Sequence, residues 1–192
     1  VSYLPQSDIV LPDSTVYEAA EEGFSRFDAM IGEMRELEER TGRGGKEAMD
    51  AAQRLSECHD TLTQSGYYDR KQRIESILFG LGFSKDDLGR SARTFSGGYQ
   101  MRIALARILV EDPDFLLLDE PTNYLDIEAL VWLEEYLRSF SGGLMLVSHD
   151  QGFLDDMVTE VYELFNGRLT RYQGNYTQYV ARREEEIKEL EK

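Results

Sequence analysis

Residues 116–123, Leu116-Leu117-Leu118-Asp119-Glu120-Pro121-Thr122-Asn123, place two adjacent carboxylates directly after a short apolar run. Such a run predicts a parallel strand that is buried on both faces. Ligands in open α/β sheets bind at the carboxyl ends of the strands, so both acids fall where a ligand is expected. Asp119 could hold Mg²⁺ beside a nucleotide phosphate, and Glu120 could orient or deprotonate an attacking water. The alternative is an acidic turn after a core strand.

The pattern around this segment predicts alternating helices and strands. Residues 144–147 form a second apolar run, and Leu130, Leu133, Leu137 and Phe140 mark a helix between the two runs, which Gly142-Gly143 are expected to close. An amphipathic helix is predicted over 97–110, and Asn166-Gly167 predicts a hairpin. The order helix, strand, helix, strand indicates an α/β fold.

A histidine and a small-residue helix start supply further candidates for phosphate binding. His149 follows the second apolar run, so we expect it at the same sheet edge as Glu120, where it could donate to a phosphate oxygen. Ser96-Gly97-Gly98 precede a helix, whose first N–H groups and partial positive charge attract phosphate. The alternatives are a surface histidine and a plain helix cap. Gln6 alone is indistinguishable from an ordinary loop glutamine.

Composition limits the class of protein. The 192 residues suffice for one domain, and the formal net charge of −16 argues against a broad nucleic-acid-binding face. The single cysteine, Cys58, excludes an internal disulfide. No apolar run approaches the ~18 residues of a membrane span. Because the chain starts at Val1 and stops at Lys192 within a charged helical pattern, we expect a piece of a longer protein.

Residues 16–90 carry helical periodicity and no strand signal, and we interpret them as a helical insert. The pattern breaks at Gly42-Arg43-Gly44-Gly45, where we expect a helical hairpin to turn.

Together these motifs resemble the ABC ATPase family over about residues 1–12 and 91–192. Gln6 matches the Q-loop, residues 95–100 the family signature, residues 116–121 the Walker B strand, Leu125-Asp126 the D-loop and His149 the switch histidine. The resemblance implies a P-loop NTPase-like α/β nucleotide-binding domain, present in part and carrying a helical insert. Residues 91–180 would hold the signature helix, Walker B strand and switch histidine.

The most detailed resemblance is to the ABC-F subfamily. It rests on residues 120–126 (Glu-Pro-Thr-Asn-Tyr-Leu-Asp), 148–154 (Ser-His-Asp-Gln-Gly-Phe-Leu) and 172–179 (Tyr-Gln-Gly-Asn-Tyr-Thr-Gln-Tyr). It implies a soluble, cytoplasmic protein with two ATPase modules that acts on ribosomes, with rRNA or tRNA as partners. This chain would be the first module, residues 181–192 would start the linker to the second, and the insert would contain an arm-like hairpin.

The resemblance also implies ATP and Mg²⁺ as cofactors and assigns roles to individual residues. Glu120 and His149 would be catalytic, and Asp119 and Gln6 would serve the metal. The nucleotide would be bound by Gln6, Ser96, Gly97, Gly98 and Asp126, with Ser96–Gly98 gripping the ATP of the opposite module.

The sequence departs from the family at one decisive point, because it contains no G-x-x-x-x-G-K-[ST] phosphate loop (Walker A). Gly44-Gly45-Lys46 is followed by Glu47, and Arg40 stands where the first glycine is needed. We expect the loop upstream of Val1, and this piece alone to bind ATP poorly.

Smaller departures are Phe95 for leucine, Tyr99 for glutamine and Tyr124 for histidine. Two alternative functions stay open at this point: the ATPase subunit of a membrane transporter, and a non-enzymatic interaction fragment.

Overall fold

The computed structural model describes residues 1–6, 11, 13–42 and 45–190, and these form two compact units. One unit comprises Val1 with the described residues of 3–8 and 114–192, and the other comprises Ser2 with those of 9–113. No helix within the described ranges combines the length and the apolar character needed to cross a bilayer. The α/β fold predicted from the motif order is confirmed by elements in the expected order.

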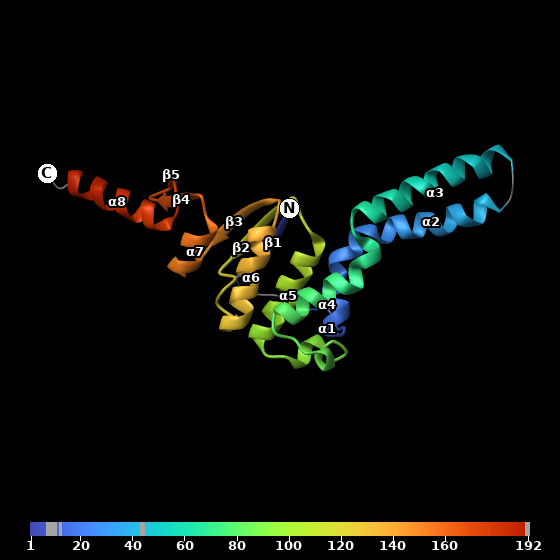
Figure 1. Ribbon diagram of the computed structural model, residues 1–192, viewed down its shortest axis with the longest axis horizontal. Helices are drawn as coiled ribbons and strands as arrows, with labels where there is room; N and C mark the ends of the chain where they lie inside the picture. Colours follow the sequence, from blue (N-terminus) through green and yellow to red (C-terminus); the bar gives the residue numbers. More distant parts are fainter. Residues whose placement is uncertain (7–10, 12, 43–44, 191–192) are drawn as a thin grey trace. The chain divides into compact units, whose positions relative to one another are not determined.

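The unit of residues 9–113 is built from helices (Figure 1). In chain order these are α1 (Val16–Glu21), the 3-10 helix η1 (Glu22–Phe27), α2 (Asp28–Thr41), α3 (Lys46–Gln64), η2 (Tyr67–Asp69), α4 (Arg70–Gly80), η3 (Lys85–Asp87), η4 (Ala92–Thr94) and α5 (Gly97–Glu111). Helices α1 and α4 both pack on α5. The core of this unit therefore forms around the apolar face of the predicted 97–110 helix, where Ile103, Leu105 and Leu109 are almost fully buried.

The helix starts of this unit follow local sequence signals. Thr15 is the N-cap of α1: its hydroxyl accepts the N–H of Glu18, and the Glu18 carboxylate accepts the N–H of Thr15 at 2.8 Å. This reciprocal pair is a capping box, which satisfies two backbone donors at once. The Thr15 N–H and hydroxyl hold the pKa of Glu18 below its ordinary value.

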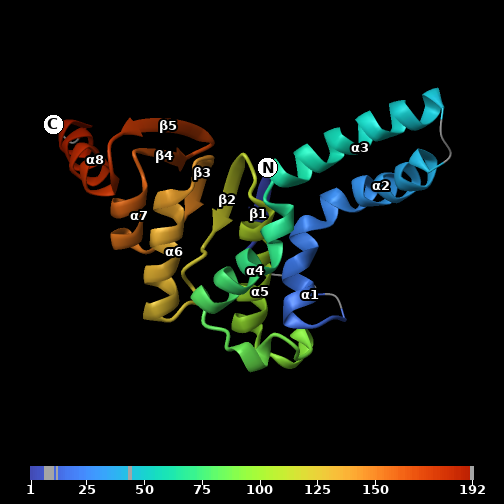
Figure 2. The same cartoon turned by 45° about the vertical axis from the view of Figure 1, so that its right-hand side comes forward.

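Helices α2 and α3 lie side by side as a hairpin (Figures 1 and 2). Arg54 of α3 bonds Glu33 of α2, with its Nε 2.8 Å from Oε1, and Met34 and Leu37 of α2 are buried. The predicted turn at residues 42–45 includes Arg43 and Gly44, which lie outside the described residues. Gly45 precedes α3 with φ +84°, a left-handed conformation suited to glycine.

The other unit contains a three-stranded sheet in the order β1-β2-β3 (Figure 2). The strands are β1 (Ser2–Leu4), β2 (Phe115–Asp119) and β3 (Gly143–Val147), and β2 pairs in parallel with β3, Phe115 facing Gly143 and Asp119 facing Val147. Helix α6 (Ile127–Ser139) connects β2 to β3, as the predicted alternation requires.

The expectation that both apolar runs are buried on both faces is wrong. Leu116 and Leu118 of β2 are 0% and 2% exposed, but Met145 and Val147 of β3 are 48% and 52% exposed. Successive side chains of a strand point to opposite faces, so one face of β3 lies open within the described part of the chain.

The glycines after α6 also differ from expectation. They do not close the helix, which ends at Ser139 with Phe140 already in extended conformation. Instead they are needed for space: a Cβ on Gly142 would lie 2.7 Å from the Asp114 carbonyl oxygen, and one on Gly143 would meet the Phe115 ring. The pair thus permits the close approach of β3 to the start of β2.

The sheet is followed by α7 (Gln151–Met157), the antiparallel strands β4 (Glu160–Phe165) and β5 (Arg168–Gln173), and α8 (Tyr176–Leu190). The predicted hairpin is confirmed, with Asn166 and Gly167 both at positive φ, as a type I′ turn requires. Helix α8 packs on β4, where Arg183 Nε bonds Glu163 Oε1 at 2.8 Å. The Asp155 carboxylate of α7 accepts the N–H of Thr177 in the first turn of α8 at 2.7 Å.

Candidate functional site

The parallel register of β2 and β3 sets the candidate site. Asp119 pairs with Val147, and the N–H of Glu120 continues the ladder by donating to the Val147 carbonyl at 2.7 Å. Both strands therefore end at the same edge. Glu120 and His149, one and two residues beyond these ends, lie together there, as expected from the two apolar runs.

Glu120 has an unusual backbone. Its φ is +51°, in the left-handed region that residues other than glycine seldom adopt, and the residue is only 3% exposed. Such a conformation costs about 1–3 kcal/mol and is retained only where the surroundings enforce it. The bond to Val147 supplies part of that enforcement. Strain of this kind concentrates at functional sites, and the sequence carries no signal for it.

The Glu120 carboxylate has one oxygen that is hydrogen-bonded and one that is not. Its Oε2 accepts the backbone N–H of His149 at 3.3 Å. Its Oε1 is 3.4 Å from His149 Nε2, without hydrogen-bond geometry, and is buried with no hydrogen-bond partner. A buried polar atom of this kind costs free energy unless something bonds to it. The His149 side chain is 95% exposed. The carboxylate therefore retains one acceptor atom, Oε1, that could take a further hydrogen bond, such as one from a water brought to the site with a ligand.

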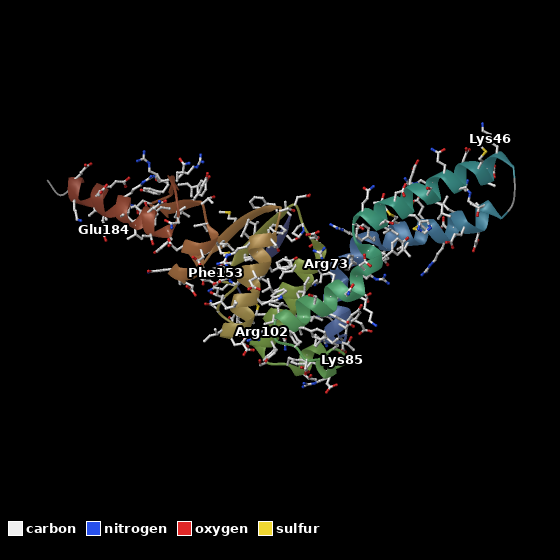
Figure 3. All side chains as sticks on the ribbon, in the orientation of Figure 1. Lys46, Arg73, Lys85, Arg102, Phe153 and Glu184 are labelled. Atoms are coloured by element: carbon white, nitrogen blue, oxygen red, sulfur yellow. The ribbon has the colours of Figure 1, made fainter. Side chains whose placement is uncertain are left out.

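The turn after β3 holds the His149 amide in place. The Ser148 hydroxyl accepts the N–H of Asp150 at 3.0 Å, and Asp150 accepts the N–H of Phe153 at 3.1 Å as the N-cap of α7. Phe153 is 2% exposed and anchors the helix (Figure 3). Sequence reasoning missed the role of Asp150, although an aspartate three residues before a buried aromatic residue is a recognisable cap signal.

The remaining predicted site residues of this unit differ in burial and in hydrogen bonding. Asp119 is the last residue of β2 and is half-buried, adjacent to Glu120 in the chain. Asp126 caps α6, its carboxylate accepting the N–H of Ala129 at 3.0 Å, so it has a structural role whatever else it binds. Gln6 is exposed, two residues beyond β1.

Ser96, Gly97 and Gly98 lie in the other unit, at the start of α5. Ser96 is the N-cap, but its side chain makes no capping hydrogen bond. Ser96 and Gly97 are exposed, and a Cβ on Gly97 would meet nothing within 4 Å. The helix start is thus open, as phosphate binding requires.

The donor set fits a magnesium nucleotide better than a metal held by protein alone. Among the described residues there is no cluster of three or more His, Cys, Asp or Glu that could hold a metal ion. Mg²⁺ binds through one or two carboxylates and takes its other ligands from water and phosphate. The half-buried Asp119 beside the buried Glu120 meets that requirement.

Comparisons with known proteins place these features in a family. A family model described as "ABC transporter" matches residues 1–123. The chain is 41% identical over 169 residues to ABC transporter F family member 3 of Arabidopsis thaliana, covering 85% of this chain and 24% of the relative. It is 35% identical over 182 residues to ATP-binding cassette sub-family F member 3 of Mus musculus, covering 95% and 26%. The chain therefore spans about a quarter of the length of these relatives.

A solved structure agrees at the level of fold. It is a dimeric ATP-binding cassette in a post-hydrolysis state, bound to ADP and Pi, with a TM-score of 0.55 and 18% sequence identity, covering 89% of this chain and 61% of that chain. At this identity the likeness concerns the fold alone.

Proposed function

Because the chain belongs to the ABC transporter family, and within it to the ABC-F subfamily, we propose that it is the ATP-hydrolysing core of a two-module protein acting on ribosomes. Membership makes it an ATP-binding domain of the ABC ATPase fold. The observation that carries the proposed hydrolysis is the buried Glu120 carboxylate, whose Oε2 accepts the His149 amide and whose Oε1 makes no hydrogen bond.

Each residue at the sheet edge has a separate part in this proposal. Glu120 orients the attacking water and accepts its proton through Oε1, while the His149 amide keeps the carboxylate from turning. Asp119 and Gln6 serve the metal, and the exposed His149 ring donates to a phosphate oxygen. When bound, Mg-ATP supplies the phosphoryl group and a cation that balances its charge.

The signature residues serve a second nucleotide. Ser96, Gly97 and Gly98 present an open helix start, and we assign it to the phosphates of the ATP held by the partner module. Asp126, the cap of α6, completes the D-loop contact with that module. This division accounts for a hydroxyl at Ser96 that its own helix does not use.

We propose that the phosphate loop comes from another part of the protein. The 192 residues contain no G-x-x-x-x-G-K-[ST], and the matched relatives are about four times as long as the matching region. On this proposal the 192 residues alone neither hold ATP firmly nor hydrolyse it.

The domain layout extends the proposal. Residues 16–90 form the helical insert, with α2 and α3 as its arm, residues 91–180 form the catalytic and signature core, and residues 181–192 begin the linker to the second module. The protein acts in the cytoplasm, with rRNA or tRNA near the arm. The α2–α3 hairpin, whose two helices are joined by the Arg54–Glu33 ion pair, supports the assignment of the arm.

Ribosome co-sedimentation tests the proposed function. The full-length protein carrying Glu120→Gln and its counterpart in the second module is incubated with ribosomes in Mg-ATP, with Mg-ADP as the control. We expect co-sedimentation with ATP only. Failure to co-sediment, in a variant shown by filter binding to retain ATP, would contradict the ribosomal role and favour the ATPase subunit of a membrane transporter.

A further inference from the structure

The start of α5 lacks the usual side-chain cap, so something else must fix its direction. Ser96 is extended, with ψ 159°, and its hydroxyl makes no bond to the first turn of the helix. Gly97 adds no side chain that could hold the turn. An N-cap side chain normally satisfies one of the free N–H groups and defines where the helix begins. The orientation of the open helix start must therefore be fixed by residues on either side of 96–98.

Three rings provide that support, and we name Phe83, Phe95 and Tyr99 the aromatic cluster. The ring centroids of Phe83 lie 5.7 Å from Phe95 and 5.4 Å from Tyr99, both edge-to-face, and those of Phe95 and Tyr99 lie 5.9 Å apart. These separations and angles are favourable for aromatic pairs. Phe83 is 4% exposed and forms the base of the cluster.

Two arginines and a glutamine complete the support. The Arg90 guanidinium lies 4.4 Å from the Phe95 ring centroid, and that of Arg102 lies 4.6 Å from the Tyr99 centroid. Arg102 is 6% exposed and also donates to the Leu81 carbonyl at the end of α4, at 3.0 Å (Figure 3). Gln100 Nε2 donates to the Phe95 carbonyl at 2.9 Å. Cation–π contacts strengthen when the guanidinium is removed from water, which applies to the buried Arg102 and not to Arg90, whose side chain is 55% exposed.

The cluster spans the helix start. Phe95 immediately precedes Ser96, and Tyr99 follows it by three residues, so the contacting pair flanks residues 96–98 in the chain while Ser96 and Gly97 stay exposed. An apolar contact between the residue before the N-cap and the first helical turn fixes the angle at which the chain joins the helix. Phe95 and Tyr99 are also two of the positions at which this sequence departs from the usual family residues. Because the rings touch, the two departures form one packing unit.

We propose that Phe95 and Tyr99 are coupled positioning residues, which together hold the Ser96–Gly98 start in the orientation that meets the phosphates of a nucleoside triphosphate. The proposal rests on the proposed function of Ser96–Gly98. Neither ring contacts the phosphates; each acts through the direction of the free N–H groups and the Ser96 hydroxyl.

A double-mutant cycle tests the coupling in the full-length protein. The variants are Phe95→Leu, Tyr99→Gln and the two combined, with Tyr99→Phe as the matched control that keeps the ring. Amide hydrogen exchange is measured without nucleotide at Gln100, whose N–H donates to the Ser96 carbonyl at 2.9 Å and closes the first turn of α5, and KM and kcat for ATP are measured separately. We expect each single variant to speed exchange and raise KM with a smaller change in kcat, and Tyr99→Phe to resemble the parent. The effects of contacting residues are not independent. The fold-change in KM of the double variant should therefore be smaller, by at least about twofold, than the product of the fold-changes of the two single variants.

The outcomes separate this proposal from the one it rests on. Single effects that multiply independently, or unchanged exchange in Tyr99→Gln, would overturn the coupled positioning role. Faster exchange with unchanged KM would support the hold on the helix start and overturn the assignment of Ser96–Gly98 to nucleotide. If Tyr99→Gln fails to fold, the comparison of Phe95→Leu with Tyr99→Phe still decides: a twofold or larger KM change in the first and none in the second supports the proposal, and equal KM values overturn it.

Discussion

The backbone N–H of His149, rather than its imidazole, donates a hydrogen bond to the buried Glu120 carboxylate, at 3.3 Å to Oε2. The ring itself is 95% exposed and lies 3.4 Å from Oε1 without hydrogen-bond geometry. Positioning and phosphate contact can therefore be separated experimentally at this residue, since a change of the ring leaves the amide in place.

Replacing Glu120 with glutamine should stop hydrolysis and preserve ATP binding in the full-length protein. The amide keeps the shape of the side chain but cannot accept the proton of the attacking water. We expect a loss of about 10²–10⁴-fold in kcat, the usual effect of removing a general base. Steady-state phosphate release and filter binding measure the two properties. Glu135→Gln, on an exposed position of α6, is the control and should retain activity. Unchanged turnover in Glu120→Gln would remove Glu120 from its proposed role.

Asp150→Ala should lower the stability of the protein because it removes the side chain that caps the start of α7. Loss of the bond to the Phe153 N–H removes an N-cap and should lower the unfolding free energy by about 1 kcal/mol, while Asp150→Asn, an equally good cap, should change it little. Urea denaturation of the two variants measures the difference. The rate of ATP hydrolysis should fall in Asp150→Ala and change little in Asp150→Asn, because the same turn holds the His149 amide. Equal losses in both variants would contradict capping as the reason.

Two glycine-to-alanine changes should have opposite effects on stability. At Gly23 a Cβ would lie 2.4 Å from the Arg107 carbonyl oxygen of α5, so Gly23→Ala should cost about 1–3 kcal/mol through overpacking. At Gly32, within α2, a Cβ would meet nothing within 4 Å, so Gly32→Ala should stabilise by up to about 1 kcal/mol from helix propensity. Thermal denaturation compares them directly. A neutral Gly23→Ala would show that η1 and α5 move apart easily.

The capping box of α1 should make stability sensitive to acid. The pKa of Glu18 is held below its ordinary value of 4.5 by the N–H of Thr15 and then by its hydroxyl. A depressed folded-state pKa contributes stability above 4.5, which is lost as the pH falls through the lower folded value. Glu18→Gln should therefore lose less stability than the parent between about pH 6 and pH 3. Urea midpoints at the two pH values measure this, with exposed Glu36→Gln as the control. Identical acid sensitivity in Glu18→Gln and the parent would argue against the box.

The order of elements and the meeting of Glu120 with His149 could be predicted because they follow from short-range patterns. Apolar runs ending in polar residues indicate parallel strands, and parallel strands bring their carboxyl ends together. The family resemblance is confirmed by the matches to the ABC family and to F-type relatives. The roles assigned to individual site residues stay predictions.

The features that escaped prediction depend on tertiary contacts. The positive φ of Glu120 accompanies its bond to Val147 on another strand, which only the fold brings within reach. Gly142 and Gly143 look like a helix end in sequence, but they are required by the proximity of Asp114 and Phe115. Likewise, the contact between Phe83 and Phe95 could not be predicted, because the two residues are 12 positions apart and no helical or strand periodicity connects them.

The open side of β3 has a practical consequence for handling the polypeptide. β3 ends the order β1-β2-β3 within the described residues, and it exposes Met145 and Val147. An edge strand with apolar side chains is a template for pairing between copies. At pH 7 the net charge of −16 keeps copies apart by repulsion, but this protection vanishes near the isoelectric point of about 4.5. Purification at neutral pH and low salt should therefore keep the polypeptide dispersed, and mild acid should precipitate it before it unfolds.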